Sequence, residues 1–414
     1  MTILLFLLLA TSIVAADDNW PRFRGPNGTG ISAATTVPAT WTTNDYRWVI
    51  TLPGGGHSSP VIVGNRIFVT CADDATGKCI LVCLDAATGK IIWQREYAST
   101  TFRKNKDCSY ATSTPAADER GVVVVWAAPE HVLMVALDND GKETWRRDLG
   151  PLVMQHGFAA SPIIASGLVI FNNDQDDPNA LPSNAKNKNK SAVAGKSFLI
   201  ALDRATGKTR WQLDRRTQLG TYGAPCLRGN ELILCSLAYG VTGVDLATGK
   251  VNWELPGVFD KRCIGSPALC GDIIFQGCGI GGVGTFFAAV KAGTQPKQIY
   301  QLEKPVPYVP TALVKDGRLF AWSDAGTVAC LDAASGKLIW RDRVQGAFYS
   351  SPIWAGGRLY NIAKNGDVFV LGTGDKFELL ARIPLGEKSF ASPAVANGTL
   401  YLRTYTKLFA VGGK

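Results

Sequence analysis

Leu84-Asp85-Ala86-Ala87-Thr88-Gly89-Lys90-Ile91-Ile92-Trp93 is the first of five copies of a motif that sets the architecture of this chain of 414 residues. Each copy has an Asp after an apolar residue, a turn that contains Gly-Lys, and a closing Trp. The other copies end at Trp145, Trp211, Trp253 and Trp340. Gly can adopt the positive φ that a tight turn needs, and the Asp side chain can accept hydrogen bonds from the turn backbone. Each copy therefore predicts a β-hairpin.

A second landmark, a small residue followed by Pro, precedes a further hairpin. The seven copies are Ser59-Pro60, Thr114-Pro115, Ser161-Pro162, Ala224-Pro225, Ser266-Pro267, Ser351-Pro352 and Ser392-Pro393. Counting back eight residues from Phe320 identifies an eighth copy, with Ala312 in the place of Pro. Two hairpins in roughly 42 residues is the period of a four-stranded propeller blade. We therefore expect an all-β fold, an eight-bladed β-propeller of four-stranded antiparallel blades.

The two ends of the chain predict how the ring closes. The last copy, Ser392 to Lys414, has room for only three strands, whereas Tyr46 to Ile50 resembles a fourth strand with no blade before it. Trp48 lies 12 residues before Pro60, as Trp340 lies 12 residues before Pro352. We expect this N-terminal strand to complete the last blade, which removes an open sheet edge. The predicted domains are an extension over residues 17–45 and a single propeller over residues 46–414.

The first residues predict export. Residues 3–16 form an apolar run that is short for a membrane span, and Val14-Ala15-Ala16 resembles a cleavage site for signal peptidase. We expect a signal peptide over residues 1–16, no transmembrane anchor, and a periplasmic or secreted protein. In such a compartment Cys71 and Cys79, which flank a polar turn, are a candidate disulfide, although cysteines are also common as small buried apolar residues.

The composition limits the class of ligand. The net charge of +9 is consistent with simple solubility or with attraction to anionic polymers, lipid headgroups or acidic sugars. Nucleic acid is not expected as a partner of an exported propeller. The polar stretch from Asn172 to Lys196 is predicted to be a mobile insertion.

One face of the propeller is predicted to carry the binding site. The loops that lead into each first strand share a face with those that join second and third strands, and the longest loops lie there. They are residues 97–112, with Arg103, Lys104 and Lys106, residues 172–196, and Gln276 to Gly284. Binding residues usually lie on loops held by a rigid scaffold. The candidates just before the innermost strands are His57, Tyr110, His156, Tyr222, Arg262, Tyr308, Tyr349 and Lys388.

These eight residues are expected to ring the mouth of the central channel. Aromatic and cationic groups suit an anionic ligand that contains a ring, although any one of them could instead pack against a neighbouring blade. His57 and His156 fall in different blades, so we expect no metal site. The recurring Trp residues are expected to pack between blades rather than to bind sugars. No nucleophile elbow, phosphate loop or carboxylate pair is evident, and catalytic residues are unknown.

The pattern Ala-x-Asp-x-x-Thr-Gly-Lys-x-x-Trp, as in Ala201 to Trp211, resembles the repeat of the PQQ-like (quinoprotein alcohol dehydrogenase-like) eight-bladed propellers over about residues 46–413. That family includes PQQ dehydrogenases, with a calcium-assisted quinone on the channel axis, and the non-enzymatic propeller BamB of the barrel-assembly machinery. The opening Trp20 to Ser32 is similar to exported PQQ-like proteins of planctomycete-type bacteria.

This chain departs from both branches of the family. No two cysteines are adjacent, whereas the dehydrogenases stack the quinone on a disulfide between neighbouring cysteines. Asp174, Asp176 and Asp177 lie near the expected face but within the predicted mobile insertion. The anchoring Cys of a BamB lipoprotein is also missing. We expect a monomeric, non-catalytic binding or scaffold protein for a protein partner or anionic polysaccharide in the cell envelope. The alternatives are a PQQ-dependent dehydrogenase, with PQQ and calcium as cofactors, and a polysaccharide-active enzyme.

Overall fold

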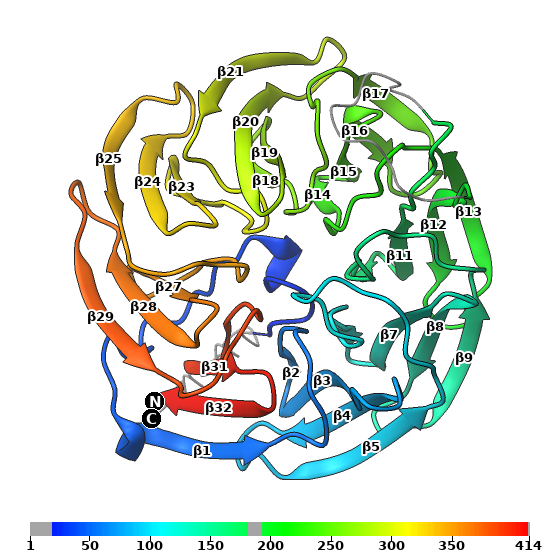
Figure 1. Cartoon of the computed structure of the whole chain (residues 1–414), viewed down its shortest axis with the longest axis horizontal. Helices are drawn as coiled ribbons and strands as arrows, with labels where there is room; N and C mark the ends of the chain where they lie inside the picture. The colour runs from blue at the N-terminus through cyan, green and yellow to red at the C-terminus, as the bar shows by residue number, and fades with distance from the viewer. Residues whose placement is uncertain (1–18, 181–192, 413–414) are drawn as a thin grey trace, which may run out of the picture.

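Eight four-stranded antiparallel sheets surround a central axis in the computed structural model of the chain, as the sequence predicts (Figure 1). The structure describes residues 19–180 and 193–412, so the expected signal peptide lies outside the described residues. The helical elements within these ranges are two three-residue 3-10 turns, η1 (Pro26–Gly28) and η2 (Thr43–Asp45). No helix in this part of the chain has the length and apolarity needed to cross a bilayer.

The first four blades follow one another directly along the chain. Blade 1 contains β2 (Val61–Val63), β3 (Arg66–Ala72), β4 (Cys79–Asp85) and β5 (Ile91–Tyr97). Blade 2 contains β6 (Ala116–Asp118), β7 (Gly121–Ala128), β8 (His131–Leu137) and β9 (Glu143–Asp148). Blade 3 contains β10 (Ile163–Ala165), β11 (Leu168–Asn173), β12 (Ser197–Asp203) and β13 (Thr209–Arg215). Blade 4 contains β14 (Cys226–Arg228), β15 (Glu231–Ser236), β16 (Gly240–Asp245) and β17 (Val251–Leu255).

The second half of the ring repeats this order until the last blade. Blade 5 contains β18 (Ala268–Cys270), β19 (Ile273–Ile280), β20 (Val283–Lys291) and β21 (Lys297–Glu303). Blade 6 contains β22 (Leu313–Lys315), β23 (Arg318–Trp322), β24 (Thr327–Asp332) and β25 (Leu338–Arg343). Blade 7 contains β26 (Ile353–Ala355), β27 (Arg358–Ile362), β28 (Asp367–Gly372) and β29 (Leu379–Pro384). Blade 8 contains β30 (Ala394–Ala396), β31 (Thr399–Arg403), β32 (Lys407–Gly412) and β1 (Tyr46–Thr51).

Blade 8 closes the ring as predicted. Its outer strand β1 comes from the N-terminal part of the chain and pairs with β32, so that Trp48 lies opposite Ala410 and Val49 opposite Phe409 (Figure 1). The paired strand covers the edge of β32, which would otherwise expose unpaired backbone groups.

The hydrophobic core is divided into layers between adjacent blades. Side chains alternate along each strand, so one face of a blade packs on the preceding blade and the other on the following blade. In β3, Ile67 and Val69 pack with residues of blade 8, whereas Phe68 packs with residues of blade 2. Each blade is therefore held by both of its neighbours rather than by a single central core.

The same alternation separates the two cysteines of the candidate disulfide. Cys79 lies opposite Ala72, and Cys71 lies opposite Ile80. Cys71 consequently points into the layer next to blade 8 and Cys79 into the layer next to blade 2. Both thiols are free and buried, so in this structure the pair fills apolar layers and forms no bridge.

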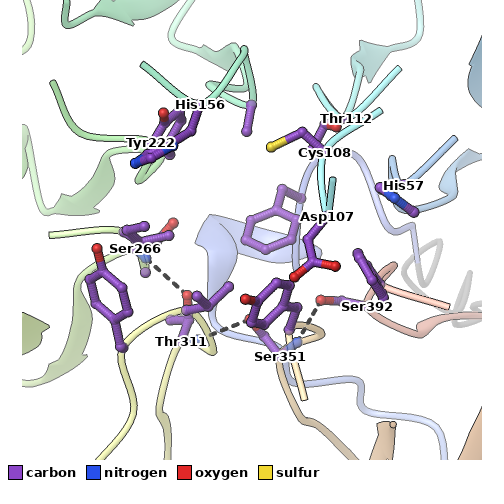
Figure 2. Close-up of a pocket in the computed structure, with 18 of the residues that line it drawn as sticks. His57, Asp107, Cys108, Thr112, His156, Tyr222, Ser266, Thr311, Ser351 and Ser392 are labelled. Atoms are coloured by element: carbon purple, nitrogen blue, oxygen red, sulfur yellow. Dashed lines mark hydrogen bonds between the residues drawn. The ribbon is translucent and has the colours of Figure 1, made fainter. Parts of the chain in front are cut away.

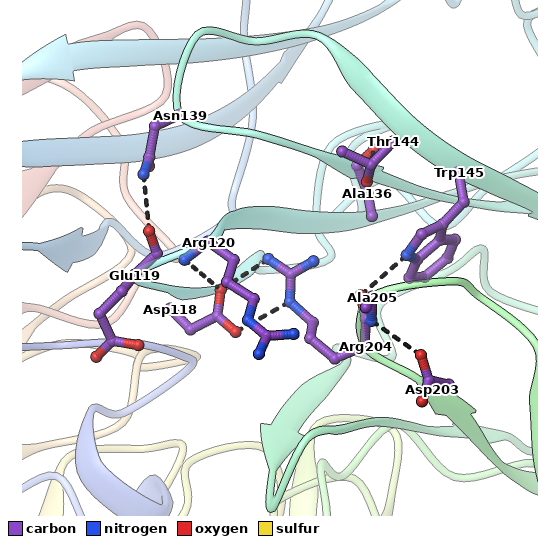
Figure 3. Close-up of polar contacts among 10 residues, drawn as sticks. All are labelled: Asp118, Glu119, Arg120, Ala136, Asn139, Thr144, Trp145, Asp203, Arg204 and Ala205. Atoms are coloured by element: carbon purple, nitrogen blue, oxygen red, sulfur yellow. Dashed lines mark hydrogen bonds and ion pairs between the residues drawn. The ribbon is translucent and has the colours of Figure 1, made fainter.

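The recurring Trp residues join each blade to the next, as the sequence predicts. The indole of Trp145 donates to the carbonyl of Arg204 at 3.0 Å (Figure 3). Its ring covers Gly207, where an added Cβ would come within 2.6 Å of the indole. Trp93 and Trp211 make the same contact with the turns of the next blades. In Figure 3 the guanidinium of Arg204 also binds Asp118 of blade 2, at 2.7 Å, and ties the same two blades together.

Two blades vary this contact. Trp253 donates to Glu231 of its own blade at 2.9 Å instead of to blade 5. In blade 5, Tyr300 takes the position of the Trp, since its hydroxyl donates to the carbonyl of Ala333 at 2.7 Å and its ring covers Gly336. The sequence motif did not identify Tyr300 because the motif was defined by Trp.

The first part of the segment before β1, residues 19–32, lies at the hub of the ring. Trp20 exchanges two backbone hydrogen bonds with Ile62 of β2, and Ile31 forms an isolated bridge with Trp354 of β26. Between them Arg24, with 1% of its surface exposed, donates to the carbonyls of Ala312 and Pro352. Within the predicted extension over residues 17–45, residues 19–32 thus form a built-in plug at the hub, whereas residues 33–45 run outwards past blade 7 to β1 (Figure 1).

Candidate functional site

An axial pocket of about 430 Å³ lies at the hub of the propeller. It is lined by the loops that lead into the first strands of all eight blades, which we call entry loops. Phe23 of the N-terminal plug also lines the pocket. Arg22 and Arg24 of the plug bond the carbonyls of Pro225, Ala312 and Pro352, just before three first strands, so the plug closes the channel at this level. The pocket is therefore a cup rather than a through-channel.

A nearly continuous ring of hydrogen bonds joins the entry loops around this cup. At each step a Ser or Thr hydroxyl accepts the backbone N–H of the landmark residue in the preceding blade, as Figure 2 shows for Ser266, Thr311, Ser351 and Ser392. The seven pairs, donor first, are Ser59–Thr114, Thr114–Ser161, Ala224–Ser266, Ser266–Thr311, Thr311–Ser351, Ser351–Ser392 and Ser392–Ser59. The ring is interrupted at Ala224, which has no hydroxyl. These Ser and Thr residues were used as landmarks in the sequence, but their hydroxyls were not recognised as part of the pocket.

Most of the predicted channel-mouth residues line a pocket. His57, His156, Tyr222, Tyr308 and Tyr349 line the axial pocket. His57 also lines a second pocket, together with Tyr110 and Lys388. Arg262 lines neither. The predicted ring is thus divided between two adjoining sites, and any role of these side chains in binding stays a prediction.

Arg262 is instead part of a buried ion pair behind the pocket wall. Its guanidinium, 3% exposed, lies 2.9 Å from Asp176, which is fully buried. Removing Arg262 would leave that carboxylate unpaired, so the residue serves stability first. In the sequence, the acidic run from Asp174 to Asp177 could have suggested a buried partner for Arg262, but this run was predicted to lie in a mobile insertion.

The first residues of that predicted insertion, 172–177, are ordered and buried. Asp174 accepts the backbone N–H of Thr221 at 3.0 Å, and Asp177 binds Arg216 at 2.8 Å. Burial raises the pKa of Asp174 to about 6 despite these donors. The expectation of mobility is wrong for residues 172–180 because the aspartates are satisfied by backbone and Arg groups, while residues 181–192 lie outside the described residues.

The second pocket, which we call the basic pocket, has a volume of about 280 Å³ and is lined by residues of blades 8 and 1 and of the loop between blades 1 and 2. Its cations are Lys104, Lys106 and Lys388, its aromatic rings are Tyr110, Phe390 and Tyr405, and its other side chains are His57, Asp74, Asp107 and Cys108. The ammonium of Lys104 lies 4.6 Å from the Tyr110 ring centre, and that of Lys388 lies 4.2 Å from Tyr405. Each ring positions a cation at the pocket wall.

The pKa of His57 reflects the positive charge around the basic pocket. Its ring stacks on Phe390 at 4.4 Å, and only 7% of the residue is exposed. Burial, and then nearby positive charge, lowers the pKa of His57 to about 3. The cations responsible are Arg403, Lys388, Lys104 and Lys364. The imidazole is therefore neutral at pH 7, in a region of positive potential.

The side chains of the axial pocket are poorly suited to covalent or acid–base catalysis. Burial raises the pKa of the Cys108 thiol to about 11, so it is protonated at neutral pH and weakly nucleophilic. Asp107 is the one carboxylate among the described lining residues, and it accepts a hydrogen bond from Lys364 at 2.9 Å. A pair of carboxylates of the kind used by glycosidases is therefore missing from this lining.

The donor set also does not fit a calcium-assisted quinone. Within residues 19–180 and 193–412, no three His, Cys, Asp or Glu side chains converge as metal ligands. Calcium needs six to eight oxygen ligands, several of them carboxylates, whereas Asp174 and Asp176 are buried and accept hydrogen bonds from the loops that lead into blades 4 and 5. We therefore derive no chemical step through this cofactor.

The tryptophan-docked blades and the cupped axial pocket define this protein as an eight-bladed propeller of the PQQ-repeat class. The model of the family described as "Outer membrane protein assembly factor BamB" matches residues 38–177, 77–262 and 301–413. Because these matches span most of the chain, the protein belongs to that family. No curated protein sequence matches it significantly.

Solved structures share the fold at low sequence identity. BamB from Moraxella catarrhalis is 15% identical, with a TM-score of 0.63 over 88% of this chain and 95% of that one. The quinohemoprotein alcohol dehydrogenase from Comamonas testosteroni is 14% identical, with a TM-score of 0.70 over 96% and 80%. The computationally designed Ika8 protein is 12% identical, with a TM-score of 0.61 over 87% and 98%. These similarities show the fold alone.

Proposed function

We propose that this protein is an exported, non-catalytic binding scaffold of the cell envelope. Its ligand, an anionic group on a partner protein or a polysaccharide, binds the face that carries the axial and basic pockets. The composition of that face carries the proposal: lysines and aromatic rings line it, while the axial pocket has a single, paired carboxylate in Asp107. The family description, an outer membrane assembly factor, supports a scaffold role in the envelope, and the apolar run over residues 3–16 supports export.

The two enzymatic alternatives have less support. A quinone-dependent dehydrogenase would need calcium ligands beside the quinone, which the described residues do not assemble. A polysaccharide-active enzyme would typically need two carboxylates facing the scissile bond, and the axial pocket lining offers only Asp107.

Calorimetry with polymers of different charge tests the proposal. We expect the protein to bind an anionic polymer, either polygalacturonate or heparin, with an affinity that falls as salt rises, and not to bind neutral dextran. Binding of dextran alone, or binding that salt leaves unchanged, would contradict an anionic ligand. Shortening of the polymer, or dye reduction on addition of PQQ and calcium, would overturn the non-catalytic assignment.

A further inference from the structure

The basic pocket contains cations that the protein itself does not neutralise. Lys104, Lys106 and Lys388 form no ion pair with any residue in the described ranges. The two carboxylates of the pocket already have partners, since Asp107 binds Lys364 and Asp74 accepts the Tyr405 hydroxyl. The lysines come from two different loops, between β5 and β6 and between β29 and β30, and so approach the pocket from separate parts of the chain.

A residue that lines the same pocket carries a buried polar atom without a partner. The Nδ1 atom of His57 forms no hydrogen bond with the described residues, although the side chain is almost completely buried. Such atoms are rare in folded proteins because burial without a partner gives up the hydrogen bonds that water would make. The ring is held between Phe390 and Tyr405, so it cannot readily turn to find a partner elsewhere in the protein. A ligand atom would satisfy it.

We propose that the basic pocket binds a tetrahedral oxyanion, a phosphate or sulfate group, with Lys104, Lys106 and Lys388 supplying charge and His57 a hydrogen bond. Lysine ammonium groups act as point charges that can surround a tetrahedral group, whereas flat carboxylates are matched best by the planar fork of Arg. The pocket offers lysines and no Arg among its lining residues. The inference rests on the proposed function, because the oxyanion would be carried by the anionic ligand of the scaffold.

Proton NMR of the histidines tests the site directly, since the chain has only three His residues. Titration with inorganic phosphate or inorganic sulfate should shift the imidazole signals of His57 and raise its pKa by roughly one unit or more, because an anion offsets the surrounding cations. His156, in the axial pocket, and His131, at the start of β8, should not respond. The anion that shifts the His57 signals more, phosphate or sulfate, is the preferred oxyanion. Acetate, a planar carboxylate, serves as the control.

Charge variants separate a built site from general attraction. Lys104→Ala and Lys388→Ala should each weaken phosphate or sulfate binding about fivefold to tenfold, and His57→Phe about tenfold. The matched control is Lys250→Ala, which removes the same charge from an exposed turn on the opposite face and should change binding less than twofold. If His57→Phe fails to fold, the two lysine variants still decide the matter because neither side chain is buried.

Three results would overturn the proposal: a response of His156 instead of His57, an equal loss in Lys250→Ala, or acetate binding as tightly as phosphate and sulfate. These outcomes are independent of the polymer experiment. Phosphate binding at His57 without any polymer binding would reject the proposed scaffold ligand and keep the pocket, whereas polymer binding with a silent His57 would reject the pocket and keep the scaffold.

Discussion

The imidazole of His57 lies between the rings of Phe390 and Tyr405, at centroid distances of 4.4 and 5.2 Å. This packing excludes water, and the neighbouring cations oppose a further positive charge, so the pKa of His57 falls to about 3. In the unfolded chain the same group titrates near its usual value of about 6.5. The difference makes His57 a source of acid sensitivity as well as a candidate ligand donor.

We predict that His57→Phe makes the protein less sensitive to acid. Between about pH 3 and 6.5 the unfolded chain binds the proton more tightly than the folded protein, so the free energy of unfolding falls as the pH drops through that window. At pH 4.5 the loss relative to pH 7 should be about 2–3 kcal/mol for the wild type from this group, and absent in His57→Phe. Urea unfolding at the two pH values measures it.

Two buried carboxyl groups change the free energy of unfolding with pH in the opposite direction to His57, so wild type and variant must be compared. Burial raises the pKa of both Asp174 and Asp324 to about 6, so their contribution to stability grows as the pH falls from about 6 towards 4. Both groups are the same in wild type and variant, so the difference between the two pH profiles isolates His57. Identical profiles would show that His57 is not buried as a neutral group.

The candidate residues were selected by their position in the repeat, and seven of the eight line one of the two pockets. His57, Tyr222 and Tyr308 were found because they precede a first strand, and every first strand starts at the hub. Arg262 satisfies the same rule but turns towards Asp176, a partner supplied by a loop of another blade. Phe390 was not singled out because an apolar ring carries no sequence signal for a pocket wall.

The hairpin turn with Gly-Lys is the element that links neighbouring blades. Its Gly has a positive φ and lies directly under the indole of the preceding blade, as Gly249 lies under Trp211. The indole N–H then donates to the carbonyl of Leu246 in the same turn, at 3.0 Å. The motif read from the sequence therefore encodes both halves of one contact, the Trp of one blade and the Gly of the next.

We predict that Gly249→Ala destabilises the protein by about 3–4 kcal/mol. A left-handed backbone costs an Ala about 1–2 kcal/mol, and the new methyl group would lie 2.5 Å from the Trp211 ring, an overlap that costs about 1–3 kcal/mol more. Gly257→Ala is the matched control, because Gly257 has nearly the same φ with nothing near its Cβ, and should cost only the backbone term. Chemical unfolding measures both, and equal losses would contradict docking of the indole.

The hairpins could be predicted from the sequence because each is encoded locally, whereas exceptions depend on the neighbouring blade. Tyr300 reaches the turn of blade 6 as a Trp would, and only the structure shows the equivalence. Trp253 has the motif but bonds to Glu231, a side chain two strands away in its own blade. The sequence of one repeat therefore does not predict which residue of another hairpin or blade its Trp or Tyr will contact.

The assembled ring depends on two segments from the N-terminal part of the chain, and only one of them was foreseen. Strand β1 was predicted because it matches the spacing of the other outer strands. The plug around Arg24 was not, since it has no periodic pattern and its role arises from carbonyl groups of blades 6 and 7 that lie about 300 residues away in sequence. Burial lowers the pKa of Arg24 to about 9, so its charge persists at neutral pH and is stabilised by those carbonyls.

At the seam between β1 and β32 the ring is closed by hydrogen bonds and packing alone. A chain that lacks residues 1–51 should expose the edge of β32 and associate into dimers or larger species through strand pairing, while the full chain stays monomeric. Deleting only residues 1–32 removes the plug and keeps β1, so this control should remain monomeric although less stable.

A peptide of residues 38–51 should restore the monomer when it is added to the chain that lacks residues 1–51, since it returns Trp48 to Gly89 and pairs with β32. Light scattering measures the mass of each species. A monomeric chain without residues 1–51, as stable as the control, would mean that the seam does not hold the ring closed.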